Sequence, residues 1–219
     1  MRRRKKYDLY IVVFLALFTI GYFVYNHTSS ESRGVENYST ALEDYKASDY
    51  EKAYQEFGKV PSGSTLKPSA LFRQARCATN MGKNELAIKK YNRIVRNGSK
   101  SSIAPISEYN MANLMFDSND KDAKKHFKKI IKKYPTSDYA IASEYYLGMI
   151  EISNQPKSPK RLAKSQEKAI NYFKNYIEKA PDGRFALKSI EEIIKLDKSL
   201  SNYDNLLIAK GYYANGEFE

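Results

Sequence analysis

The side chains best suited to nucleophilic or metal chemistry are two histidines and one cysteine. His27 lies within "NHTSS", His126 within "KKHFKK" and Cys77 within "ARCATN". A metal site needs several ligands at close spacing and a nucleophile needs a base beside it, and the sequence shows neither arrangement. It also contains no glycine-rich phosphate loop and no nucleophile elbow. We therefore expect a protein that is not an enzyme and needs no cofactor or metal, with Cys77 as a small buried thiol rather than a reactive one.

A second possible chemistry is anion binding. The chain has a formal net charge of +12 and a pI near 9.5, which favours acidic partners such as anionic lipid, nucleic acid or an envelope polyanion. The stretch "KDAKKHFKKIIKKYP" gathers many of the cations around Phe127 and Ile130. These lysines are Lys121, Lys124, Lys125, Lys128, Lys129, Lys132 and Lys133. A solvated outer helix face is the favoured interpretation, and a patch for lipid headgroups or a cell-wall polyanion is the alternative.

The N-terminal region has the pattern of a membrane anchor. "MRRRKK" is followed by residues 9–25, "LYIVVFLALFTIGYFVY", which carry no charge and form a helix about 25 Å long. The run is longer than the ~7–15 apolar residues of a cleaved signal, and no small-x-small cleavage site follows it. We expect residues 1–8 to be a cytoplasmic basic tail, residues 9–27 a transmembrane signal anchor and residues 28–35 a flexible linker. A cleaved signal peptide and a buried core helix are the alternatives.

The charge of this tail also predicts the topology. A cationic flank stays on the cytoplasmic side, so the rest of the chain should lie outside the cytoplasm, in the periplasm if the cell is Gram-negative. This placement disfavours nucleic acid as a partner. A single cysteine cannot form a disulfide within the chain, which leaves the redox compartment open.

Residues 36–219 contain a repeat with a period near 34. The stretch "ALEDYKASDYEKAYQEF" matches "ARCATNMGKNELAIKKY", and two further copies follow at wider spacing. Each copy has two small residues, then an aromatic and an apolar residue: Ala41, Ala53, Phe57 and Val60; Ala75, Ala87, Tyr91 and Ile94; Ala112, Ala123, Phe127 and Ile130; Gly148, Ala169, Phe173 and Tyr176. We expect two antiparallel helices per copy that approach closely at the small residues, and hence an all-α fold.

This pattern, with Pro135 and Pro181 closing the third and fourth copies, resembles the tetratricopeptide-repeat family over residues 36–219. Three features depart from the family: the chain has no tryptophan, the second copy ends in "RNGSK" without a proline, and Pro61 comes about one turn early. The second helix of the first copy should therefore be short. The resemblance implies an α-solenoid of about four helix pairs plus extra helices, following the transmembrane helix.

The resemblance also implies a concave groove, lined by the first helix of each pair, that takes extended peptides. Aromatic residues recur along these first helices and could grip such a peptide. They are Tyr38, Tyr45, Phe72, Tyr109, Phe116 and Tyr145. With their apolar neighbours they also form the i, i+3, i+4, i+7 stripe of a core face. Core packing is the favoured interpretation, and groove lining is the alternative.

The C-terminal part departs from the regular frame. Ser158 followed by Pro159 predicts a helix start, and we expect a long helix over residues 159–179. A further helix over 185–197 does not fit the period, and a last one covers about 203–214. Ala209 and Tyr213 align with Ala41 and Tyr45, and the sequence ends where the next helix would follow. We expect a truncated repeat here, or alternatively a last helix that packs back on the domain.

Together these features predict a membrane-anchored scaffold outside the cytoplasm that binds a protein or an extended peptide. The layout is similar to the single-pass periplasmic proteins that accompany the secretion translocon. The alternative is the N-terminal region of a longer envelope enzyme, such as a lytic transglycosylase, which carries a helical superhelix before its catalytic domain. A relative of the tetratricopeptide lipoproteins of outer-membrane assembly is placed third, because the N-terminal region has no cysteine for lipid attachment.

Overall fold

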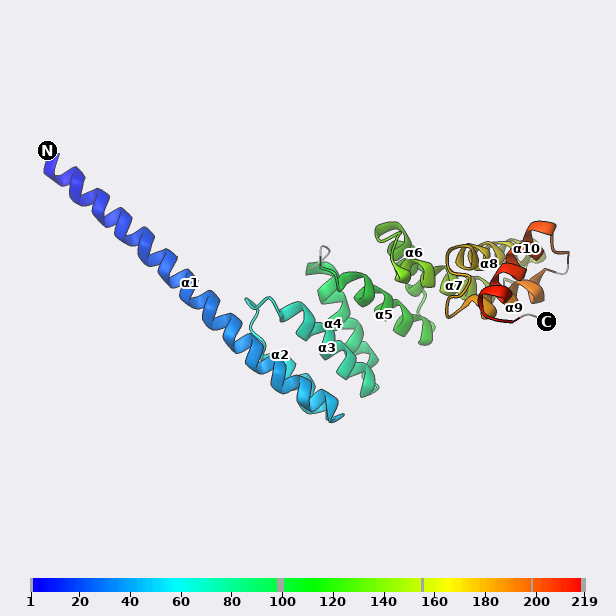
Figure 1. Ribbon diagram of the computed structural model, residues 1–219, viewed down its shortest axis with the longest axis horizontal. Helices are drawn as coiled ribbons and strands as arrows, with labels where there is room; N and C mark the ends of the chain where they lie inside the picture. Colours follow the sequence, from blue (N-terminus) through cyan, green and yellow to red (C-terminus); the bar gives the residue numbers. More distant parts are fainter. Residues whose placement is uncertain (1, 98–100, 155, 198, 218–219) are drawn as a thin grey trace. The chain divides into compact units, whose positions relative to one another are not determined.

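The computed structural model describes residues 2–97, 101–154, 156–197 and 199–217, with side chains from Val12 onward except Asn97. Within these residues the secondary structure consists of α-helices, as the repeat pattern predicted, and contains no β-strand (Figure 1). The helices are α1 (Arg2–Lys46), α2 (Tyr50–Lys59), α3 (Lys67–Asn80), α4 (Asn84–Asn97), α5 (Ala104–Asp117), α6 (Ala123–Lys133), α7 (Asp138–Ser153), α8 (Pro159–Lys179), α9 (Ala186–Leu196) and α10 (Asn202–Ala214).

The chain divides into two compact units, Met1–Ile103 and Ala104–Glu219. The first unit contains α1 to α4, and the second contains α5 to α10. The sequence placed residues 36–219 in one repeat domain, whereas this division falls between the second and third helix pairs. Each unit has its own buried apolar residues and is treated separately below.

Helix α1 is continuous through the stretch that the sequence analysis assigned to a flexible linker. Residues 28–35 are helical because one face of this stretch packs on the loop between α2 and α3. The Glu31 carboxylate accepts a hydrogen bond from the Thr65 backbone N–H at 2.7 Å. A Cβ at Gly34 would lie 2.3 Å from Ser64 Oγ, so only glycine allows this approach. These contacts hold the backbone in a helix that serine and glycine alone would not favour.

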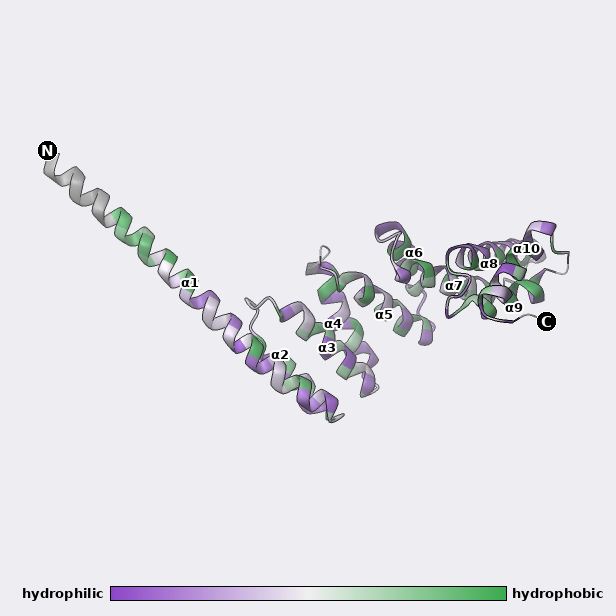
Figure 2. Ribbon diagram, in the orientation of Figure 1, coloured by the Kyte–Doolittle hydropathy of each residue, from purple (hydrophilic) through white to green (hydrophobic). Residues whose placement is uncertain are grey.

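Before this packed stretch, α1 is apolar and uncovered. Figure 2 shows its apolar segment followed by a mixed segment that runs alongside α2. The side chains from Val12 to Thr28 are all exposed, and Phe23 is 70% accessible. Among the described helices, α1 alone is long and apolar enough to cross a membrane. A signal sequence can have the same length and composition.

The repeat positions form the core, as predicted. The first small residues, the second small residues and the aromatic residues of all four copies are buried, and so are Val60, Ile94, Ile130 and Tyr176. Gly148 shows why the first position must be small, because a Cβ there would lie 2.5 Å from a ring carbon of Phe173. Helix α2 ends at Lys59, just before Pro61, which confirms the expected short helix.

The later helices confirm three predicted elements and correct one. Helix α8 begins at Pro159 after Ser158, as expected, and α9 and α10 match the two predicted C-terminal helices. However, α9 does fit the repeat pattern. Two buried small residues, three apart, occur in α5, α7 and α9: Ala104 and Ser107, Ala140 and Ser143, Ala186 and Ser189. Helix α9 thus occupies the first-helix position of a fifth pair.

Helix α10 packs back on α8 and α9, which was the alternative expectation for the end of the chain. Its buried small residue is Gly211, where a Cβ would lie 2.6 Å from Ile190, whereas Ala209 is exposed. The alignment of Ala209 with the buried Ala41 is therefore wrong. Tyr203 and Leu206 on the other side of α10 are exposed.

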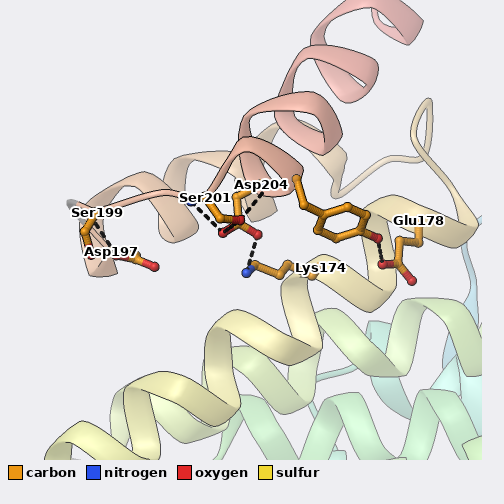
Figure 3. Close-up of polar contacts among 7 residues, drawn as sticks. Lys174, Glu178, Asp197, Ser199, Ser201 and Asp204 are labelled. Carbon is orange, nitrogen blue, oxygen red and sulfur yellow. Dashed lines mark hydrogen bonds and ion pairs between the residues drawn. The ribbon is translucent and has the colours of Figure 1, made fainter.

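Polar contacts fix the start of α10 (Figure 3). Ser201 and Asp204 form a capping box, in which Ser201 Oγ accepts from the Asp204 backbone N–H at 3.2 Å and the Asp204 carboxylate accepts from the Ser201 backbone N–H at 3.1 Å. Lys174 of α8 forms an ion pair with the same carboxylate. The Tyr203 hydroxyl donates to Glu178, also on α8. These bonds join the last helix to the fourth pair.

The contact between Gly148 and Phe173 gives a stability prediction. Gly148→Ala should lower the free energy of unfolding by about 1–3 kcal/mol because of overpacking, although alanine is the better helix former. Urea denaturation of the full chain in detergent measures the change. In a Phe173→Leu background the ring carbons are gone, so adding Gly148→Ala should cost less than it does in the native chain. Equal costs in the two backgrounds would show that this contact does not set the helix spacing.

Candidate functional site

The predicted aromatic residues lie between the helices of each pair. Four of them contact the aromatic residue of the second helix in the same pair, with ring centroids 5.3–6.3 Å apart. These contacts are Tyr38 with Phe57, Phe72 with Tyr91, Tyr109 with Phe127, and Tyr145 with Phe173. Such tilted or edge-to-face contacts are favoured between aromatic rings. These four rings therefore pack in the core, the interpretation that the sequence favoured.

The other two predicted aromatic residues lie near the ends of their helices. Tyr45 packs against Tyr50 at 5.5 Å, and Phe116 packs against Tyr146 at 5.3 Å. Both are half-buried, as are Tyr38, Phe72 and Tyr109, while Tyr145 is 9% exposed. A role of the six residues in partner binding stays a prediction. Tyr109 and Phe116 each line a surface hollow.

The first of these hollows lies on the second unit and has a volume of about 350 Å³. Tyr109 of α5 and the first turn of α7 form one side, and the loop before α9 forms the other. Phe185 in that loop stacks on Tyr145 with ring centroids 4.2 Å apart, and the Arg184 guanidinium lies 4.8 Å above the Phe185 ring. The side formed by the start of α7 is mainly apolar and contains Tyr139, Ile141 and Ala142. This hollow therefore combines apolar walls with two charged residues, Asp138 and Arg184.

The second hollow, of about 380 Å³, is lined by α5, α7 and α9 together with the start of α8. Its apolar wall contains Phe116 of α5, Met149 and Ile152 of α7, Leu162 of α8 and Leu196 of α9. We call the surface of α5, α7 and α9 that carries both hollows the first-helix face. Open apolar hollows with a few polar groups are suited to holding the side chains of a bound segment.

Buried carboxylates join the helices behind this face. Glu108 of α5 is fully buried, and it contacts Lys129 Nζ at 2.6 Å and His126 Nδ1 at 3.2 Å, both on α6. Burial raises the pKa of the Glu108 carboxyl, but the hydrogen bonds and charges of His126 and Lys129 outweigh it and the net pKa is lowered. His126 is thus explained as part of a structural ion-pair cluster.

Two further carboxylates of α7 are paired in the same way. Glu151 contacts Lys124 of α6 at 2.6 Å, and Glu144 contacts Lys179 of α8 at 2.8 Å. Burial raises the pKa of Glu151, but Lys124 and the Ser165 hydroxyl lower it more, so the carboxyl is ionised at neutral pH. A buried charge that lost its partner would be strongly destabilising, so these pairs specify which helices lie next to each other.

The lysine cluster of α6 is therefore partly neutralised. Lys124 and Lys129 are engaged with buried carboxylates, and Lys133 lies 5.2 Å above the Tyr134 ring. The others are exposed and make no ion pair within 4.0 Å among the described residues: Lys121, Lys125, Lys128 and Lys132. The outer helix face accounts for their placement, and the anion patch stays a prediction.

The remaining candidate for chemistry is Cys77. It is fully buried in α3, as expected, and burial raises the pKa of its thiol to about 11, so the thiol is protonated at neutral pH. In the part of the chain that the structure describes, no three side chains of the metal-ligating types come together.

Comparison with known proteins identifies the family. A family model described as YfiO, outer membrane lipoprotein, matches residues 64–218, which is more than half of the chain. The chain belongs to the YfiO family. No curated protein sequence matches it.

Solved structures show the same fold. A crystal structure of MamA, a tetratricopeptide-repeat protein, has a TM-score of 0.61 at 16% identity and covers 84% of this chain and 93% of its own. A MamA RS-1 ArsTM double mutant has a TM-score of 0.60 at 11% identity and covers 84% and 95%. The tetratricopeptide-type fold of this YfiO-family chain is therefore established.

The family match changes the order of the functional interpretations. Sequence reasoning placed a relative of outer-membrane tetratricopeptide lipoproteins last, whereas this is the interpretation that the YfiO model supports. That interpretation was placed last because the N-terminal region has no cysteine for lipid attachment, and the one cysteine of the sequence is Cys77. Sequence reasoning also missed Arg184 and Phe185. Their position beside the first hollow depends on α9 being a first helix, and only the spacing of Ala186 and Ser189 could have indicated it.

The buried Glu108 carboxylate gives a pH prediction. Because its folded-state pKa lies below the ordinary value of 4.5, it contributes stability at neutral pH that is lost as the pH falls below 4.5 towards the folded pKa. The free energy of unfolding of Glu108→Gln should therefore fall less in this range than that of the native chain. Urea denaturation at a series of pH values measures the difference, with the exposed Glu85→Gln as the control for a lost surface charge. Parallel curves for Glu108→Gln and the native chain would contradict the prediction.

Proposed function

We propose that this YfiO-family protein is a non-enzymatic scaffold that binds an extended segment of a partner protein along the first-helix face. The observation that carries the proposal is the pair of hollows on α5, α7 and α9. The two hollows lie towards opposite ends of α7, so one extended segment crossing the face can place a side chain in each. The Arg184 guanidinium suits a carboxylate of that segment.

The proposed location is a membrane of the cell envelope. The apolar part of α1 from Val12 to Tyr25 is covered by none of the residues that the structure describes, and a bilayer would bury it. The family description, outer membrane lipoprotein, supports an envelope location. In this protein a single-pass helix would replace the lipid as the anchor. The cationic N-terminus would face the cytoplasm and the repeats would lie outside it.

The family match favours this scaffold over the N-terminal region of a lytic transglycosylase. The match reaches residue 218 and carries the description of a lipoprotein rather than an enzyme. A bound protein segment is also the kind of ligand that an α-solenoid surface holds in general.

Filling the first hollow tests the proposed binding face. Phage-displayed peptides are selected on the full chain in nanodiscs, and the affinity of one selected peptide is measured by fluorescence anisotropy. Ala142→Phe places a ring in the hollow and should weaken binding by about tenfold or more, because well-packed interface contacts contribute over 1 kcal/mol. The matched control is Ala163→Phe on the exposed side of α8. If both variants bind alike, the first-helix face is not the binding surface.

Charging the apolar segment tests the anchor. The double variant Leu15→Arg/Phe18→Arg should leave the membrane fraction on alkaline carbonate extraction, because each arginine at the centre of a span costs about 2.5–3.5 kcal/mol on insertion scales. Ser32→Arg/Ser39→Arg adds the same charge farther along α1 and should stay in the membrane fraction. Extraction of the native chain itself would show that α1 is not a transmembrane anchor.

A further inference from the structure

The loop between α2 and α3 lies close to the apolar segment of α1. Glu31 and Gly34 of α1 pack on this loop, and the Asn37 side-chain amide donates to the Lys59 carbonyl at 3.1 Å. Glu31 follows the last apolar residue, Tyr25, by six positions, or about 9 Å along a helix. The headgroup layer on each side of a bilayer is roughly 5–8 Å thick. If α1 spans a membrane, as proposed above, this loop lies at the level of the headgroups or just above them.

Cations gather beside this loop. One hollow of about 370 Å³ is lined by Ser62, Ser64 and Thr65 of the loop, by Lys67 of α3 and by Arg93 of α4. Arg93 also lines a neighbouring hollow of about 450 Å³, together with Lys89, Lys90 and Arg96. The two hollows share Arg93, and Arg93 and Arg96 lie near the end of α4, where Arg93 meets the loop. We call Lys67, Arg93 and Arg96 the headgroup cluster.

Few carboxylates compensate these cations. Glu31 is occupied by hydrogen bonds from Thr65 and Ser64, and Glu56 is paired with Lys59 at 2.7 Å. Glu85 lies in the first turn of α4, at the opposite end of that helix from Arg93 and Arg96. Within the described part of the first unit, neither of these arginines has a carboxylate within 4.0 Å.

Among the described residues, the Lys67 ammonium group is paired with backbone carbonyls and not with a carboxylate. It donates to the carbonyl of Gly58 at 3.3 Å and to that of Val60. Burial lowers the pKa of Lys67, and the charges of Arg93 and Lys90 lower it further. An anion placed between Lys67 and Arg93, which line the same hollow, would relieve this repulsion.

We propose that the headgroup cluster binds the phosphate of an anionic phospholipid in the membrane that α1 spans. The proposal rests on the proposed function of α1 as an anchor. The bound lipid would attach the first unit to the bilayer at a second point beside α1. This attachment would fix the rotation of the unit about the axis of α1. Each cation near an anionic surface contributes roughly a factor of five in affinity.

The test uses the full chain with Ser62→Cys, labelled with a maleimide fluorophore and placed in nanodiscs. Ser62 is exposed and lines the loop hollow, whereas the buried Cys77 thiol, with its pKa raised to about 11, does not react at neutral pH. Two sets of phosphatidylcholine discs are compared. One contains a small share of nitroxide-labelled phosphatidylglycerol, and the other the same share of nitroxide-labelled phosphatidylcholine. We expect the phosphatidylglycerol nitroxide to quench the label about fivefold more strongly.

Two arginine substitutions provide the comparison. Arg93→Gln/Arg96→Gln, both at exposed positions, should abolish the preference for phosphatidylglycerol. The matched control Lys46→Gln/Arg76→Gln removes the same charge from exposed positions at the other end of the unit and should keep it. The basic N-terminus is present in every variant, so its own lipid binding contributes equally to the quenching measured for each.

The outcomes separate this proposal from the anchor. Quenching by both lipids without a preference would overturn the headgroup site and leave the anchor intact. Absence of quenching by either lipid would overturn the anchor and the site with it. A preference that disappears with excess inorganic phosphate, but not with chloride at the same ionic strength, would show that the site takes free phosphate, which also overturns the lipid assignment.

Discussion

The close approach of two helices at a small residue is the constraint on which each helix pair depends. Where Gly148 meets Phe173, the ring occupies the space that a Cβ would take. The same geometry applies where Ala41, Ala75 and Ala112 are fully buried. With the backbones this close, one aromatic ring fills the wedge between the helices and a second ring packs against it. The spacing of the two helices in a pair therefore determines how its core is packed.

Charge pairing then specifies which pairs are neighbours. Lys124 on α6 reaches Glu151 on α7, the first helix of the following pair, while Glu108 and Glu144 each bind a lysine within their own pair. Apolar packing is tolerant of exchange between similar helices, whereas a buried carboxylate without its lysine is not. Lys124 and Lys129 of α6 are thus engaged with buried carboxylates of the fold, although Lys129 remains exposed to solvent on the outer side of the helix.

The repeat and its core could be predicted from the sequence because small and aromatic residues must recur wherever helices pack in the same way. Pro61 and Pro159 also act locally, so the short α2 and the start of α8 were predictable. Three features were not. The helical state of residues 28–35 depends on a loop more than thirty residues away, and the role of α9 depends on its neighbours. The hollows depend on loop residues such as Arg184 and Phe185, whose position no local pattern indicates.

The unbroken course of α1 has a mechanical consequence. No flexible joint separates its apolar segment from the part that packs in the first unit, so any tilt or rotation of the segment is passed on to the first two helix pairs. From Tyr25 to Lys46 the helix extends about 30 Å. If α1 spans a bilayer as proposed, it would tilt to match the thickness of the hydrocarbon layer. The first unit would then lean by the same angle, so lipid composition would set the angle at which this unit meets its surroundings.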